Sequence, residues 1–218
     1  MPRFFAKRGI SLEDTMRTKP AKDLRVTKTL EAIDTTFRAM MLEKGFAAIT
    51  VKGLCERARI NKKTFYRYYE TLEDLLVEVM AGYAAAWRKR TGHLRMPDDI
   101  AQITREFFLF GSEQDALYDA ITCDPAWDAV QRSLQDDASG EHVENVPDGY
   151  TPERWHLVYA WQSGAVLGMY RAWVADGKSV PADVAAELAA SLVLGGLEAL
   201  GGQARVGTAV ADGLGGSR

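Results

Sequence analysis

Apolar residues recur at intervals of three and four along most of the 218-residue chain, which is the spacing of one face of an α-helix. Leu30, Ile33 and Phe37 begin the first such face, which we expect to run from residue 27 until Gly45 turns the chain. No segment shows the strict alternation of apolar and polar residues that is typical of a half-buried strand. The pattern therefore predicts an all-α fold.

Two short helices are predicted directly after this first one. The hydroxyl of Thr50 can cap a helix of about two turns, and Asn61 is a good N-cap for a second helix running through Tyr69. Arg59 and Ile60 form a tight connection between the two. A longer apolar helix that supports two short, adjacent helices joined by a tight turn predicts a helix-turn-helix.

The rest of the chain is predicted to be helical with one loop. Thr71 and Asp74 have the spacing of a capping box, which would open a helix ending near Gly92. Asp124 and Thr151 are expected to cap two later helices. In order, the remaining segments are predicted helices over 99–110, 113–122 and 125–137, a loop over 139–149, and two final helices over 152–176 and 181–200.

The two final helices have almost no polar face. Such helices must be buried on more than one side, and a second copy of the chain is the expected cover. Small residues on both helices would let them approach closely. The alternative is a tight helix pair within one chain. The predicted dimer-interface residues are Gly164, Gly168, Ala189 and Gly196.

Charge is distributed unevenly along the chain. Residues 1–69 contain 16 lysines and arginines against 7 acids, whereas residues 70–218 contain 11 against 23. A basic N-terminal third favours binding to a polyanion, although a solvated charged surface would show the same count. Cys55 and Cys123 are too isolated to suggest a disulfide framework or a zinc site. Without an export signal or an apolar stretch of membrane-spanning length, we expect a cytoplasmic protein.

The second short helix is the candidate for contact with DNA. If Phe65 and Tyr69 face inward, the opposite face is cationic, and its N-terminal end would reach base edges in the major groove. Tyrosine hydroxyls and nearby lysines would contact phosphates. The predicted DNA-binding residues are Thr50, Lys52, Asn61, Lys62, Lys63, Thr64, Tyr66, Arg67 and Tyr68.

The segment ITVKGLCERARINKKTFYRYYETLEDLL resembles the DNA-binding motif of the tetracycline-repressor-like (TetR) family, and the resemblance extends over residues 27–80. It implies an N-terminal three-helix DNA-binding domain, a larger helical domain for dimerisation and effector binding, and a homodimer on a palindromic operator. It also implies a repressor that a small molecule releases. The sequence departs from the family pattern at Arg59, where glycine is common, and at Leu72, where a lysine often contacts phosphate. Thr36 and Phe37 replace a common pair of small residues.

These expectations divide the chain into a flexible basic arm (1–26), a helix-turn-helix domain (27–70), an effector and dimerisation domain (71–200) and a disordered tail (201–218). Trp127, Tyr159 and Tyr170 are named as candidates to line an apolar effector pocket. Aromatic residues at helical spacing are more often part of a core, so that alternative stays open.

Other function classes have less support. His93, His142 and His156 lack the spacing of a helical metal pair, and no phosphate loop, dinucleotide fingerprint or nucleophile elbow is present. We therefore expect no cofactor, no metal and no enzymatic activity. A helical protein that docks another protein is the second possibility, but it would not need the basic N-terminal third.

Overall fold

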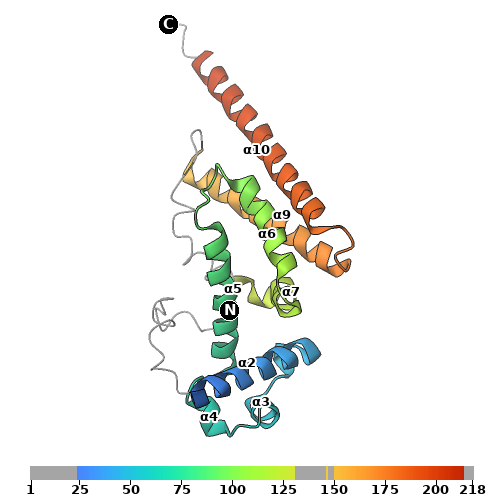
Figure 1. Cartoon of the computed structure of the whole chain (residues 1–218). Helices are drawn as coiled ribbons and strands as arrows, with labels where there is room; N and C mark the ends of the chain where they lie inside the picture. Colours follow the sequence, from blue (N-terminus) through green and yellow to red (C-terminus); the bar gives the residue numbers. More distant parts are fainter. Residues whose placement is uncertain (1–23, 131–145, 147–149, 214–218) are drawn as a thin grey trace. The chain divides into compact units, whose positions relative to one another are not determined.

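The computed structural model describes residues 24–130, 146 and 150–213, and every regular element in this part of the chain is a helix (Figure 1). The prediction of an all-α fold is therefore confirmed. The predicted arm up to residue 23, most of the loop over 139–149 and the tail from residue 214 lie outside the described residues. In order, the elements are α2 (Leu24–Lys44), η1 (Phe46–Ala48), α3 (Val51–Arg57), α4 (Lys62–Tyr66), α5 (Leu72–Thr91), α6 (Ile100–Glu113), α7 (Ala116–Cys123), η2 (Pro125–Trp127), α9 (Pro152–Ala175) and α10 (Ala182–Gly213).

The described helices form two compact units. Unit 1 contains residues 24–86 and 115–130, and unit 2 contains residues 87–114, 146 and 150–213. The helix α5 belongs to unit 1 as far as Ala86 and to unit 2 from Trp87. The helix-turn-helix thus shares its unit with the first part of α5, α7 and η2, all of which the sequence analysis had assigned to a second domain beginning at residue 71.

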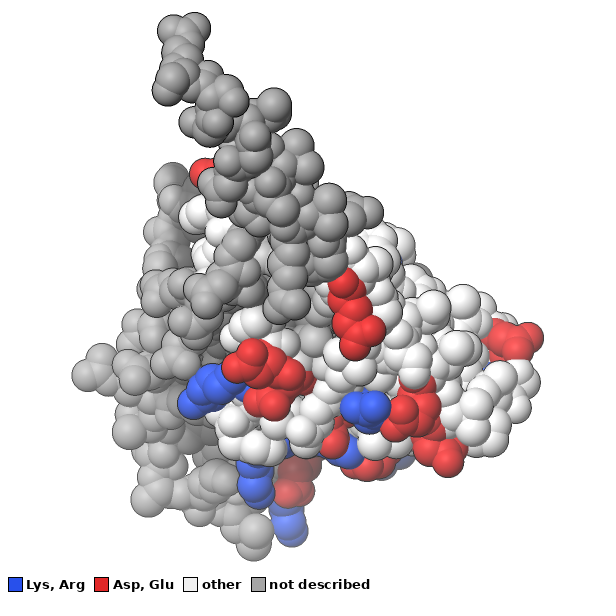
Figure 2. All heavy atoms as spheres, turned by 90° about the horizontal axis from the view of Figure 1, so that it is seen from above, with Lys and Arg blue, Asp and Glu red and all other residues white. Residues whose placement is uncertain are grey.

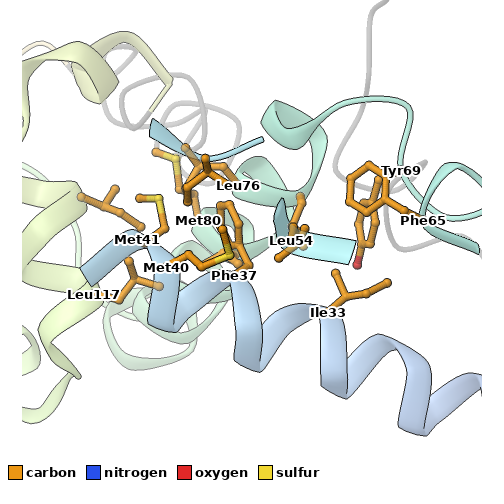
Figure 3. Packing of buried hydrophobic residues seen from close by; sticks show 14 of the residues in the cluster. Ile33, Phe37, Met40, Met41, Leu54, Phe65, Tyr69, Leu76, Met80 and Leu117 are labelled. Carbon is orange, nitrogen blue, oxygen red and sulfur yellow. The ribbon is translucent and has the colours of Figure 1, made fainter. Parts of the chain in front are cut away.

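The core of unit 1 forms around α2. Ile33 and Phe37 of α2 are completely buried, and Figure 3 shows their side chains facing Leu54 of α3 and Phe65 of α4. Burial of side chains of this size contributes roughly 1.5–3 kcal/mol each. The same cluster includes Leu76 and Met80 of α5 and Leu117 of α7. These contacts attach α3 and α4 to a common support.

The predicted helix starts are confirmed by their capping hydrogen bonds. The hydroxyl of Thr50 accepts from the backbone N–H of Gly53 at 3.1 Å, and Asn61 Oδ1 accepts from that of Thr64 at 2.7 Å. Thr71 and Asp74 form the expected reciprocal pair, in which each side chain accepts from the backbone N–H of the other at 2.9–3.1 Å. Each bond satisfies a donor that a helix terminus would otherwise leave without a partner.

The end of α3 requires a left-handed residue. The N–H of Ile60 donates to the carbonyl of Cys55 and that of Arg59 to Glu56, which is the Schellman pattern of a helix C-terminus. Arg59 occupies the position that glycine usually takes, and its φ is 55°. Arg59 therefore carries the strain of a left-handed conformation that glycine would adopt freely.

In unit 2, α10 packs closely along α6 because its contact face consists of small side chains. Ala185, Ala186, Ala189 and Ala190 are all buried there. The helix α9 instead meets α6 through aromatic rings: Tyr170 lies 5.0 Å from Phe107 and 5.6 Å from Phe108 between ring centroids. Ala185 and Ala189 therefore pack within one chain, in the contact between α6 and α10. The alternative considered for the small residues was instead a tight pair of the two final helices, α9 and α10.

Two predicted helix ends differ from the structure. Regular α4 ends at Tyr66 instead of Tyr69, because the N–H groups of Tyr68 and Tyr69 both donate to the carbonyl of Phe65 in a closing turn. The last helix continues to Gly213, beyond the predicted end at Leu200. Glycine in a helix interior costs about 1 kcal/mol relative to alanine, which weakens a helix without forbidding it.

We predict that Arg59→Gly raises the free energy of unfolding by about 1 kcal/mol. A left-handed conformation costs an L residue roughly 1–2 kcal/mol, and the greater freedom of glycine in the unfolded chain cancels part of the gain. Urea denaturation of both proteins measures the difference. Arg67→Gly is the matched control, because Arg67 has ordinary right-handed geometry at φ −72° and its replacement should destabilise. Equal stability of the two variants would contradict the prediction.

We predict that Gly111→Ala lowers the free energy of unfolding by about 1–3 kcal/mol, the usual cost of overpacking. A Cβ at this position would overlap the hydroxyl of Tyr170 and lie 2.6 Å from the ring, far inside van der Waals contact. Gly82→Ala is the control, since no heavy atom lies within 4 Å of a Cβ there and alanine favours the helix. Thermal denaturation should move the two melting temperatures in opposite directions, and a stable Gly111→Ala would refute the close packing of α6 on Tyr170.

Candidate nucleic-acid interface

The N-terminal end of α4 presents cationic and hydroxyl side chains to solvent. Lys62 and Lys63 are exposed, while Phe65 on the opposite side has no exposed surface. Asn61 Oδ1 accepts from the hydroxyl of Thr64 at 2.9 Å in addition to its backbone N–H. The cap therefore fixes Thr64 while the two lysines extend into solvent.

The cations of this surface differ in whether a carboxylate neutralises them. Among the described residues, Lys62 and Lys63 have no ion-pair partner. Arg57 of α3 donates to Glu43 of α2 through both terminal guanidinium nitrogens, Nη1 and Nη2, the latter at 2.6 Å. Lys52 lies 3.9 Å from Glu56, and both side chains are about two-thirds exposed, so solvent screens this contact. The two lysines of α4 are available to an anion.

Aromatic side chains surround the end of α4. Tyr66 is 54% exposed, whereas Tyr68 is half-buried and packs against the core with the guanidinium of Arg67 5.9 Å from its ring centroid. Tyr69 is buried, and this desolvation, with help from Glu78, raises the pKa of its hydroxyl. Tyr66 is thus the tyrosine whose hydroxyl is best placed to donate to an external group.

The structure places all nine predicted DNA-binding residues on α3, α4, their caps and the turn after α4, within unit 1. Arg59 joins them, because it is exposed in the turn that connects the two helices. Thr50 uses its oxygen as a helix cap and keeps its O–H free to donate. These residues together form a cationic surface with hydrogen-bonding side chains, and the helices that present it pack on the buried core of unit 1.

A polar network joins this surface's support to later helices, which sequence analysis missed. Arg38 of α2 donates to Tyr83 of α5 at 3.1 Å and pairs with Asp115 at the start of α7 at 3.2 Å, while Tyr83 donates to Asp115 at 2.5 Å. Burial, followed by the bond to Asp115, raises the pKa of Tyr83. Burial opposes ionisation of Asp115, but the bonds from Tyr83 and Tyr118 outweigh it and lower the pKa of this carboxyl. The helices α2, α5 and α7 are therefore braced together.

The three predicted pocket residues do not share one unit. Trp127 is half-buried in unit 1, where its ring meets Phe46 edge-on with centroids 5.0 Å apart. Tyr159 is half-buried and Tyr170 is fully buried, both on α9 of unit 2. Tyr170 packs among other aromatic rings, which is the arrangement of a core residue. The assignment of these residues to an effector pocket remains a prediction.

The four predicted interface residues occupy different environments. Gly164 and Gly168 are exposed on α9, where an added Cβ would have no heavy atom within 4 Å, and Gly196 lies against the ring of Trp161. Ala189 is 2% exposed and belongs to the α6 contact, so it does not lie on the free face. Large apolar side chains beside the two glycines stay exposed, notably Leu157 at 69% and Trp161 at 53%. Figure 2 shows broad uncharged areas on one face, with more acidic than basic side chains among the described residues.

We also searched the described residues for a metal site and for a membrane-spanning helix. No group of three or more histidine, cysteine or acidic residues is arranged to hold a metal there. None of the described helices is long and apolar enough to cross a bilayer.

Comparison with known proteins agrees with this geometry. Residues 35–79 match the family of bacterial regulatory proteins designated tetR. No curated protein sequence matches the chain. The fold is similar to that of the fatty acid degradation regulator FadR from Bacillus halodurans, with a TM-score of 0.56 and 13% identity, over 82% of this chain and 98% of that one. The capped helix-turn-helix lies within the matched segment, so residues 35–79 form a DNA-binding domain of the TetR family.

Proposed function

We propose that this protein binds a palindromic operator in double-stranded DNA as a homodimer, represses transcription, and leaves the operator when a small-molecule effector binds. The observation that carries the proposal is the Asn61-capped end of α4, where Lys62 and Lys63 are exposed and unpaired among the described residues. A polyanion supplies the charges that this end lacks.

The side chains divide into two roles on a duplex. Lys62, Lys63 and Thr64 stand at the N-terminal end of a short helix, which fits the major groove and brings such residues to base edges. Lys52 and Tyr66 lie further from that end and suit phosphate contacts, which set register without reading sequence. Glu56 lies close to Lys52 and Glu43 pairs with Arg57, so these two carboxylates repel phosphates less than unpaired ones would.

A second copy of the chain is the proposed cover for the exposed face of α9 and α10. Gly164 and Gly168 leave space for close helix approach, and Leu157, Trp161 and Leu188 provide apolar surface that a single chain leaves in water. A two-fold interface repeats each surface on both subunits. Two copies of α4 would then contact half-sites about 34 Å apart on one side of the duplex.

Release by an effector follows from linkage. An effector lowers the affinity for DNA only if it binds the DNA-free form more tightly than the DNA-bound form. The helix α5 begins in the core of unit 1, through Leu75 and Leu76, and continues into unit 2. It offers a continuous connection between a ligand in unit 2 and the support of α4.

We predict that Lys62→Ala or Lys63→Ala weakens binding to an operator selected from genomic fragments by about 1–3 kcal/mol and relaxes specificity at one base pair, as expected for a lost base contact. Lys52→Ala should weaken all sequences evenly and reduce the salt slope by roughly one. Fluorescence anisotropy over a series of salt concentrations measures both quantities.

Lys89→Ala is the matched control for these variants, because it removes the same charge from an exposed position in unit 2. It should leave affinity nearly unchanged. Salt-independent binding by the wild-type protein, or losses with Lys89→Ala as large as with Lys62→Ala, would count against α4 as the DNA-contacting helix.

We predict that Gly168→Trp weakens dimerisation by roughly 5- to 150-fold, because overpacking a helix contact costs about 1–3 kcal/mol. Sedimentation velocity measures the change. The folded monomer should tolerate the substitution, since no atom lies within 4 Å of a Cβ at Gly168.

Gly82→Trp serves as the control for dimerisation, since Gly82 is equally open but lies on α5. It should leave the dimer intact, and circular dichroism verifies that both variants are helical. A wild-type protein that sediments as a monomer would refute the dimer.

A further inference from the structure

Arg88 of α5 lies in unit 2, and one edge of its guanidinium is shielded from solvent. Among the described residues, neither Nε nor Nη2 of this edge has a hydrogen-bond acceptor. A buried charged donor without an acceptor destabilises the folded protein more than a buried neutral donor without an acceptor does. A ligand that brings the missing acceptor would remove this cost.

The two unpartnered atoms are the pair that a single carboxylate contacts. Nε and Nη2 lie side by side on the planar guanidinium and donate in parallel to the two oxygens of an oxyanion. The same unit contains the complete arrangement elsewhere: Arg105 donates to Glu187 through Nε at 2.6 Å and Nη2 at 3.1 Å. Arg88 presents the same edge without the carboxylate.

Two acids of α6 pair with another arginine of α5. Arg90, two residues further along α5, pairs with Glu106 at 2.5 Å and with Glu113 at 2.6 Å, both from α6. These two ion pairs connect α5 to α6, and neither of them includes Arg88.

The interior of unit 2 has few other polar groups. Among the described residues of this unit, Thr104 and Gln162 are the buried polar side chains, and Thr104 already donates to the carbonyl of Ile100. Trp155 is 2% exposed, and its indole N–H is a second buried donor that has no acceptor among the described residues. The other buried side chains described in unit 2 are apolar or aromatic.

We propose that Arg88 anchors the effector, and that this effector is an organic anion with a carboxylate or phosphate head and an apolar body. The head accepts from Nε and Nη2 of Arg88, and the apolar body contacts the aromatic interior of unit 2. This inference rests on the proposed function, since it names the chemical class of the molecule that would release DNA. Arg88 lies on α5, the helix that continues into the core of unit 1.

The experiment uses the full chain without DNA and follows thermal stability and tryptophan fluorescence. The probes are dodecanoate, dodecyl phosphate and uncharged dodecanol below micelle-forming concentrations, with acetate and inorganic phosphate as heads alone. One or both long-chain anions should bind, and Arg88→Met should weaken that binding at least about tenfold, the loss expected for a charge-assisted pair. The two anions distinguish a carboxylate from a phosphate ligand.

Arg88→Lys keeps the charge but loses the paired donors, so it should also weaken anion binding. Arg105→Met is the matched control, because its Nε and Nη2 edge is filled by Glu187 and its loss should leave anion binding unchanged. Without ligand, Arg88→Met should melt at the same temperature as the wild type or higher, since it removes an unpaired buried donor.

Three outcomes overturn the inference. The first is a lower melting temperature of ligand-free Arg88→Met, which would reveal a partner for Arg88 within the chain. The second is binding of dodecanol, acetate or inorganic phosphate as tight as that of the long-chain anions, and the third is no binding of either long-chain anion.

The DNA proposal is tested separately. A chain that binds the anion through Arg88 but binds no DNA refutes the proposed function alone, whereas one that binds DNA but no anion refutes this inference alone.

Discussion

Burial of Phe65 is the interaction on which the DNA-contacting surface depends. The helix α4 has five residues, and a helix of this length has no stability of its own in water. The ring of Phe65 is fully buried in the cluster that also contains Leu54, Tyr69 and Phe37. Because Phe65 fixes the rotation of α4 about its axis, Lys62 and Lys63 must face solvent. The Asn61 cap then satisfies the exposed amides at the same end.

The support beneath α4 is assembled from distant parts of the chain. Arg38, Tyr83 and Asp115 connect three helices through a half-buried polar network, and Trp127 adds an aromatic contact with Phe46. Buried polar groups in such a network are costly to leave unpaired, so they restrict how the helices can be arranged. A rigid support preserves the angle at which α4 meets the duplex, which matters because base contacts depend on direction.

In unit 2, the two helices that pack against α6 use side chains of different size. Alanines bring α10 against α6, whereas aromatic rings hold α9 further away, except where Gly111 admits Tyr170. The opposite surface of α9 retains Gly164, Gly168 and exposed apolar residues, which is the basis for the proposed dimer. In the same unit, the guanidinium edge of Arg88 is buried without a partner among the described residues, which points to an anion as the missing component.

The sequence by itself determined the features that depend on neighbours a few residues away: the helical class, the caps at Thr50, Asn61 and Thr71, and the outward position of Lys62 and Lys63. Only the tertiary structure decided which small residues face inward. Ala189 and Gly168 both belong to stripes of small residues in the sequence, but only Ala189 is buried, in the unit where α10 packs against α6. It likewise placed Trp127 with the helix-turn-helix and buried one edge of Arg88. Each of these outcomes depends on segments far apart in the chain, whose packing no local pattern encodes.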